Sequence, residues 1–183
     1  MAAPPERDEA GTPCVLGAIA VAEALEALGG LGWEAVAAHE GGAAAVLHQH
    51  LRQVPGLTLY GDAGPFDPDT RLGVFPFNLG NLPHGLVAAV LDHEWGIGVR
   101  SGCFCAHPYV KSLLGLTPRA IERFESRSRA GDHSDQPGMV RASVGLASTR
   151  TDAERLVTAL HAIQRGEHGE YREDHHGTWA PVA

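Results

Sequence analysis

Lysine is nearly absent from this chain of 183 residues, in which the only one is Lys111. Chemistry that needs an imine on a lysine amine therefore has a single candidate, and Lys111 lies in no recognisable lysine motif, so we expect a surface residue. Basic charge is scarce as a whole, because 14 Lys and Arg residues face 22 Asp and Glu residues and the formal net charge is −8. Nucleic acids and anionic membranes attract dense positive charge, so neither is an expected partner.

Long apolar runs are missing as well. No stretch of about 18 apolar residues occurs, and residues 1–10 lack a basic region followed by an apolar one, so neither a membrane span nor a secretion signal is indicated. The three cysteines, Cys14, Cys103 and Cys105, are an odd number, and a bridge within the close pair would be strained. We therefore expect reduced thiols and a cytoplasmic location.

The composition that remains is that of an ordinary globular protein. Hydrophobic residues make up 44% and charged residues 20%, and a chain of this length can bury roughly 70% of the surface that its unfolded form exposes. We expect one domain over residues 11–165, preceded by a short lead-in at 1–10 and followed by a polar, loosely held tail at 166–183.

Hydrophobic periodicity predicts helices at 15–28, 33–53, 84–94, 118–127 and 151–164, and strands at 57–60, 72–79, 96–100 and 140–146. Thr117 and Pro118 suit the N-cap and first position of the fourth helix, and Thr12 suits the cap of the first. Residues 126–138 should form a mobile loop. This order predicts an α+β fold, with a small mixed or antiparallel sheet of three to four strands and helices on one face.

The segment R-S-G-C-F-C-A-H-P, from Arg100 to Pro108, carries most of the functional signal. A cysteine is a useful nucleophile only when its thiolate is accessible, which requires a loop and nearby positive charge or backbone donors. Cys105 meets those conditions, five residues after Arg100. Cys103 is equally well explained as a small buried hydrophobic residue.

The same segment resembles the pattern R-[ST]-G-x-x-C-A-x-P of the class V aminotransferases, in particular the cysteine desulfurase and selenocysteine lyase group. The resemblance extends over residues 9–165. Further matches are the E-A-G-T-P element at 9–13, Phe77-Asn78 with Pro83-His84, Val140-Arg141-Ala142-Ser143, and the closing helix around 155–157.

The resemblance implies an enzyme that uses pyridoxal phosphate and a cysteine-like amino-acid substrate, with a fold like the small domain of a fold-type I pyridoxal-phosphate enzyme. Cys105 matches the residue that takes sulfur as a persulfide, Arg141 the arginine that holds the substrate carboxylate, and Arg100 a second active-site arginine. Thr12 matches a contact to the cofactor phosphate of a neighbouring subunit, which implies a homodimer. The cofactor lysine would precede residue 9, so we expect a C-terminal domain that is inactive alone and needs a cofactor-domain partner.

Three alternatives stay open at this stage. A relative that transaminates or acts on another amino acid is compatible with the motif. Cys103, Cys105 and His107 form C-x-C-x-H, and His133 or a member of the tail pair His175-His176 would complete four ligands for a metal ion. The third alternative is a noncatalytic module, in which the apolar stripe at 15–28 drives dimerisation or binds another chain.

Overall fold

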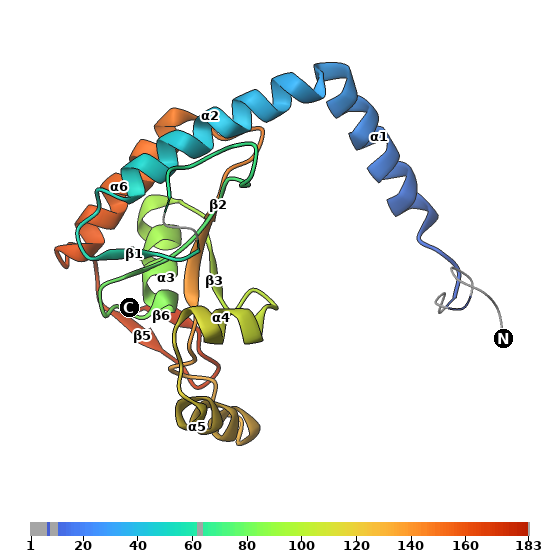
Figure 1. The fold of residues 1–183 in the computed structure, drawn as a ribbon. Coiled ribbons are helices and arrows are strands. Elements are labelled where there is room, and N and C mark those ends of the chain that lie inside the picture. Colours follow the sequence, from blue (N-terminus) through green and yellow to red (C-terminus); the bar gives the residue numbers. More distant parts are fainter. Residues whose placement is uncertain (1–6, 8–10, 62–63, 183) are drawn as a thin grey trace. The chain divides into compact units, whose positions relative to one another are not determined.

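The computed structural model describes residues 7, 11–61 and 64–182, drawn as coloured ribbon in Figure 1. The chain forms two compact units, Met1–His39 and Glu40–Ala183. Most of the expected lead-in, including the first two residues of E-A-G-T-P, lies outside the described residues. Each unit is described by itself below.

The first unit contains helix α1 (Val15–Leu31) and the beginning of helix α2 (Trp33–Leu51). The predicted stop at the glycine pair 29–30 is wrong: α1 continues to Gly32, whose φ of 88° ends it. Glycine costs a helix about 1 kcal/mol, whereas a left-handed residue terminates it outright. The N-cap is Cys14 and not Thr12. No residue of α1 is buried.

The second unit is built on a four-stranded sheet of order β1-β2-β4-β3, in which every neighbouring pair is antiparallel. Its strands are β1 (Leu57–Leu59), β2 (Val74–Leu79), β3 (Arg100–Gly102) and β4 (Met139–Ser143). The register sets Pro76 of β2 and Arg100 of β3 on either side of Arg141 in β4. The predicted α+β fold is confirmed.

Three helices supply the core on one face of this sheet. They are the C-terminal half of α2, α3 (His84–Trp95) and α6 (Arg150–Gln164), whose buried side chains form one cluster with those of β2 and β4. Successive strand residues point to opposite faces, which is why Phe75, Phe77 and Leu79 are buried while residues 76 and 78 are not. A reciprocal capping box between Thr149 and Asp152 starts α6.

Local signals also fix α5 (Pro118–Arg129), the next helix after α4 (His107–Leu113). The Thr117 hydroxyl accepts a hydrogen bond from the Ala120 amide at 3.3 Å, so the predicted cap is confirmed. The expected mobile loop at 126–138 begins with the last turn of α5, and Arg127 then donates to Asp132 at 2.9 Å and to Ser134 at 2.8 Å. This network gives the segment a defined conformation.

Two further expectations differ from the structure. The strand expected at 96–100 begins only at Arg100, because Gly96 adopts a left-handed φ of 62° as the C-cap of α3 and residues 97–99 connect the two elements. The tail expected to be loose forms a hairpin of β5 (Tyr171–Glu173) and β6 (Trp179–Pro181).

Contacts with α3 hold the hairpin, which Figure 1 shows beside that helix. The Glu94 carboxylate accepts hydrogen bonds from the Tyr171 hydroxyl and the Gly169 amide, each at 3.0 Å. Trp179 lies so close to Gly85 that a Cβ there would be 2.6 Å from the indole ring. Among the described residues no single helix is long and apolar enough to cross a membrane, although α1 and α2 together, with the break between them, meet that length and composition.

Candidate active site

The predicted arginines lie together on the face of the sheet that α2, α3 and α6 do not cover, called the uncovered face below. Antiparallel partners project to the same face, so Arg100, Arg141 and Pro76 form one row opposite the face that carries Phe77. Asn78 follows two residues after Pro76 and joins this face. Arg100 is exposed on the edge strand, and Arg141 is half-buried. Two of the predicted site residues are thus direct neighbours.

Arg141 has an unused hydrogen-bond donor. Its guanidinium carbon lies 5.1 Å from the centroid of the Phe104 ring, a cation–π contact. Its Nε atom is buried, and among the described residues it has no hydrogen-bond partner. A buried donor left unpaired costs about 1–3 kcal/mol, so this atom is poised to gain from an acceptor supplied by a ligand.

Asn78 provides the matching acceptor on the same face. Its Nδ2 group donates to the Tyr60 hydroxyl at 3.4 Å and to the Gly138 carbonyl at 3.2 Å. These bonds fix the amide, and its Oδ1 atom is buried with no partner within the described part of the chain. A ligand that carries both a carboxylate and a hydrogen-bond donor would satisfy the two orphan atoms.

Cys105 lies on a strained, exposed turn. The Ala106 amide donates to the Cys103 carbonyl at 2.8 Å and closes a four-residue turn whose central residues, Phe104 and Cys105, have φ of 53° and 59°. Positive φ at both central positions is the pattern of a type I′ turn, which favours Gly and Asn. Each non-glycine residue held there costs about 1–3 kcal/mol. In this turn conformation the Phe104 ring contacts the Arg141 guanidinium, and the Cys105 side chain is exposed.

Cys103 has a different environment. It is half-buried, and its thiol donates to the Pro137 carbonyl with 3.1 Å between sulfur and oxygen. Burial raises the pKa of Cys103, and the positive charge of Lys111 offsets part of that rise. The expectation of a small buried hydrophobic residue thus misses its polar contact. Cys103 also lines a cavity of about 430 Å³, which is treated below.

Pyridoxal phosphate is held through an imine on a lysine amine, and Lys111 is the only lysine in this sequence. Its surroundings therefore decide whether this chain alone has a suitable amine. Its ammonium lies 2.8 Å from Glu125, whose pKa is lowered by that hydrogen bond. The Lys111 side chain is only 20% exposed, so it is a paired group beside the cavity rather than a freely solvated one. The uncovered face fits a substrate carboxylate, but this sole lysine is committed to a carboxylate and does not fit an imine.

The other predicted residues are placed as follows. Thr12 is exposed and lies in the first compact unit, just before α1. Within the described residues, no group of three or more His, Cys, Asp or Glu side chains is arranged to hold a metal ion. The ligands of the Cys/His alternative are thus not gathered in this structure, since the Cys103 thiol donates to the Pro137 carbonyl while Cys105 is exposed on the turn.

Phe104 and the Asn78 amide, whose Oδ1 atom has no partner among the described residues, belong to this site although the sequence did not predict them. Asn78 had a usable signal, since it is the polar residue between Phe77 and Leu79 in an alternating strand. Phe104 had none, because its contact with Arg141 depends on the turn. The amide of Asn78 depends likewise on Tyr60, 18 residues away.

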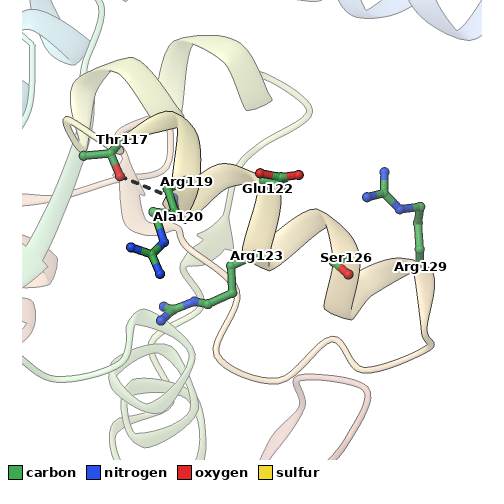
Figure 2. A pocket seen from close by; sticks show the side chains of 7 residues that line it. All are labelled: Thr117, Arg119, Ala120, Glu122, Arg123, Ser126 and Arg129. Carbon is green, nitrogen blue, oxygen red and sulfur yellow. Dashed lines mark hydrogen bonds between the residues drawn. The ribbon is translucent and has the colours of Figure 1, made fainter.

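A hollow larger than the cavity beside Cys103 lies outside this site. It measures about 660 Å³ and lies along α5, where Figure 2 shows Arg119, Arg123 and Arg129 among its lining side chains. Arg123 lies over the ring of Phe124, 4.9 Å from its centroid. None of the predicted site residues lines this hollow, so size does not mark the active site here.

Comparisons with known proteins agree with the site motif. The family model described as aminotransferase class-V matches residues 1–156. A cysteine desulfurase from Dickeya dadantii is 38% identical over 162 residues, which are 88% of this chain and 32% of that protein. One from Escherichia coli K12 is 35% identical over 161 residues, with 88% and 33% covered.

Solved structures give the same picture. The apo cysteine desulfurase from Thermococcus onnurineus NA1 superposes with a TM-score of 0.67 and 27% identity, over 91% of this chain and 35% of that one. The S-sulfonic acid form of the cysteine desulfurase CsdA from Escherichia coli shares the fold, with a TM-score of 0.60 and 24% identity over 83% and 31%. The chain spans about a third of the length of the curated relatives it matches. It matches a portion of a cysteine desulfurase, and it belongs to the aminotransferase class-V family.

Proposed function

We propose that this chain supplies two parts of a pyridoxal-phosphate-dependent, cysteine desulfurase-like site. They are the thiol turn, residues 103–106, and the substrate-binding arginines Arg100 and Arg141. The observation that carries the proposal is the pairing of Cys105, exposed on a turn with two left-handed non-glycine residues, with Arg141, which has a buried unpaired donor. Phe104 links the two through its ring. Strain held at an exposed nucleophile beside an unsatisfied cation is typical of catalytic sites.

In the proposed reaction, the Cys105 thiolate attacks the sulfur of a cysteine substrate. A sulfur–sulfur bond forms and the substrate's carbon–sulfur bond breaks, with its electron pair remaining on the carbon. That carbon takes up a proton, so the products are a Cys105 persulfide and alanine. Pyridoxal phosphate, when bound, supplies the electron sink that makes the substrate's carbon–sulfur bond labile.

The arginines would hold the substrate carboxylate. A guanidinium presents two parallel donors that match a carboxylate, and Arg141 has its Nε free for this role. The Phe104 ring covers one side of the Arg141 guanidinium and keeps water from that side. Arg100, its cross-strand neighbour, adds a second positive charge at the same end of the row. We assign Thr12 to a phosphate contact across a homodimer, in keeping with its place before a helix.

Fusion to the missing lysine would test this proposal. The unmatched two thirds of the Dickeya dadantii relative would be joined in front of this chain, and cofactor absorbance and alanine release from cysteine would be recorded. We expect a cofactor band and alanine release that Cys105→Ser lowers by about 10³-fold or more, whereas Cys14→Ser leaves it unchanged. A cofactor band with undiminished alanine release in Cys105→Ser would refute the role of Cys105, and the absence of any band would refute complementation by this chain.

A second candidate function rests on α1. Six of its large apolar side chains are more than half exposed, namely Val15, Leu16, Ile19, Val21, Leu25 and Leu31. Exposed apolar side chains gathered on one helix favour burial against another chain, here a second copy of the protein. Sedimentation of the wild type and of Leu16→Lys tests it: a wild-type dimer that the substitution converts to monomer supports dimerisation through α1, and a wild-type monomer contradicts it.

A further inference from the structure

The two thiols of the turn are close in sequence but face different surroundings. Two peptide units separate Cys103 from Cys105, which keeps their Cα atoms within about 7 Å of each other. Cys105 is exposed, whereas Cys103 is half-buried and donates its S–H to Pro137. A protonated, partly buried thiol reacts slowly with reagents in solution. Cys103 is therefore placed to react with a neighbour rather than with a free molecule.

A cavity adjoins Cys103. It has a volume of about 430 Å³ and lies between α4, α5 and the segment that carries Pro137. Four basic side chains share its wall with the thiol, namely His107, Lys111, Arg129 and His133. Lys111 is paired with Glu125, while Arg129 makes no ion pair within the described residues. Sulfur bound to Cys103 would therefore lie in a cavity that is lined by basic side chains and by Glu125, and that Cys105 does not line.

Resting on the proposed function, we propose that Cys103 is a second sulfur-bearing catalytic residue, which takes the outer sulfur from a Cys105 persulfide and holds it in the cavity between α4 and α5. The Cys103 sulfur attacks the outer sulfur of the persulfide. The bond between that atom and Cys105 Sγ breaks, its electron pair stays on Cys105, and the Cys103 proton ends on the Cys105 thiolate. One sulfur–sulfur bond replaces another, so no external oxidant or reductant is consumed.

Proximity favours this step over direct loading of Cys103. Groups held in one short turn react with effective molarities far above any reagent concentration in solution. The exchange needs only rotation of the two side chains and a loss of the Cys103 contact with Pro137. The cavity then supplies room for a small acceptor to reach the transferred sulfur.

The test uses the full chain and sodium polysulfide as the sulfur donor. After timed quenching with iodoacetamide, trypsin releases Ser101–Lys111, which contains both thiols of the turn, and fragment ions assign the added sulfur to one or the other. In the wild type we expect Cys105 to load first and Cys103 to follow. In Cys105→Ser and Cys105→Ala, loading of Cys103 should fall at least about tenfold, while Cys14, the third and exposed thiol, serves as the internal reference.

The matched variant Cys103→Ser should prolong the lifetime of the Cys105 persulfide, because the acceptor of its outer sulfur is gone. Equal loading of Cys103 with and without Cys105 would overturn the relay. A Cys103–Cys105 disulfide that forms with release of sulfide would also overturn it, since Cys103 would then discharge the persulfide instead of carrying sulfur. If Cys105 loads and Cys103 never does, only this inference fails. If Cys105 loads no faster than Cys14, the proposed function fails as well.

Discussion

The two faces of one sheet differ in the polarity of the side chains they carry around Phe77 and Arg141. On the helix-covered face, Phe75, Phe77 and Val140 are at most 1% exposed and belong to a single apolar cluster. On the other face, the alternate residues of the same strands include Asn78 and Arg141, each with a buried polar atom that no described residue satisfies. Residues that are adjacent in a strand therefore have different roles. Phe77 and Val140 stabilise the fold, whereas the next residues, Asn78 and Arg141, have polar atoms that a ligand could pair with.

The largest expected effect is a loss of stability from a substitution on the helix-covered face. Phe77→Ala should lower the free energy of unfolding by about 3–5 kcal/mol, because it leaves a cavity at a site with no solvent exposure. The matched change on the next residue, Asn78→Ala, removes bonds to Tyr60 and Gly138 and should cost about 1 kcal/mol. Urea unfolding of both variants checks the comparison, and equal losses would contradict the division between the faces.

A substitution at Gly138 tests the close packing beside Gly102, the last residue of β3 before the thiol turn. A Cβ at this position would lie 2.6 Å from His84 Nε2 and 2.7 Å from the Gly102 Cα. Because backbone cannot move aside cheaply, Gly138→Ala should destabilise the fold by about 3 kcal/mol. The control is Gly145→Ala, where the added methyl meets nothing within 4 Å and should change stability by less than about 0.5 kcal/mol. Thermal unfolding that ranks the two variants in reverse would refute this account.

Local signals explain what the sequence predicted well. Thr117 and Pro118 start α5 as expected, and alternation in β2 separates Phe77 from Asn78. These features are encoded within a few residues of one another, which is the range over which caps and strand alternation act.

Long-range contacts explain what the sequence did not reveal. The tail becomes a hairpin because Tyr171 reaches Glu94, 77 residues away, and because Trp179 packs on Gly85. Helix α4 has seven residues, too few for a periodic pattern. The contact between Phe104 and Arg141 likewise requires the turn and the strand register together, so sequence patterns alone had no means to predict it.

Arg141 offers a sharper test of the uncovered face. Its role in the fold is measured by the free energy of unfolding, and its proposed role in binding the substrate is measured by the KM for cysteine. Arg141→Met should change the free energy of unfolding by no more than about 1 kcal/mol, since it gives up a cation–π contact and removes an unpaired donor. In the fused enzyme described above, the same change should raise the KM for cysteine at least about 30-fold, which corresponds to the loss of a charged hydrogen bond to a carboxylate. Arg150→Met, on an exposed helix residue paired only with Glu154, should alter neither quantity appreciably. A large loss of stability with an unchanged KM would assign Arg141 to the fold instead of the ligand.

The smallest effect concerns His84, which lies where the sheet, α3 and the segment before β4 meet. Burial lowers the pKa of His84 below its ordinary value of 6.5, and its Nε2 atom lies 2.9 Å from the Gln136 carbonyl. The folded protein therefore binds fewer protons at this site than the unfolded chain does, and stability must fall as the pH drops below 6.5 toward the folded-state pKa. His84→Gln keeps a side-chain donor for Gln136 and removes the titration, so its free energy of unfolding should decrease less than that of the wild type between pH 7.5 and 5.5. Urea unfolding at the two pH values measures that difference, and identical decreases would mean that His84 keeps its ordinary pKa in the folded protein. His84 Nδ1 is a further buried atom without a partner among the described residues, so protonating it would bury a charge with no hydrogen-bond acceptor, which is the physical reason for the expected loss of stability.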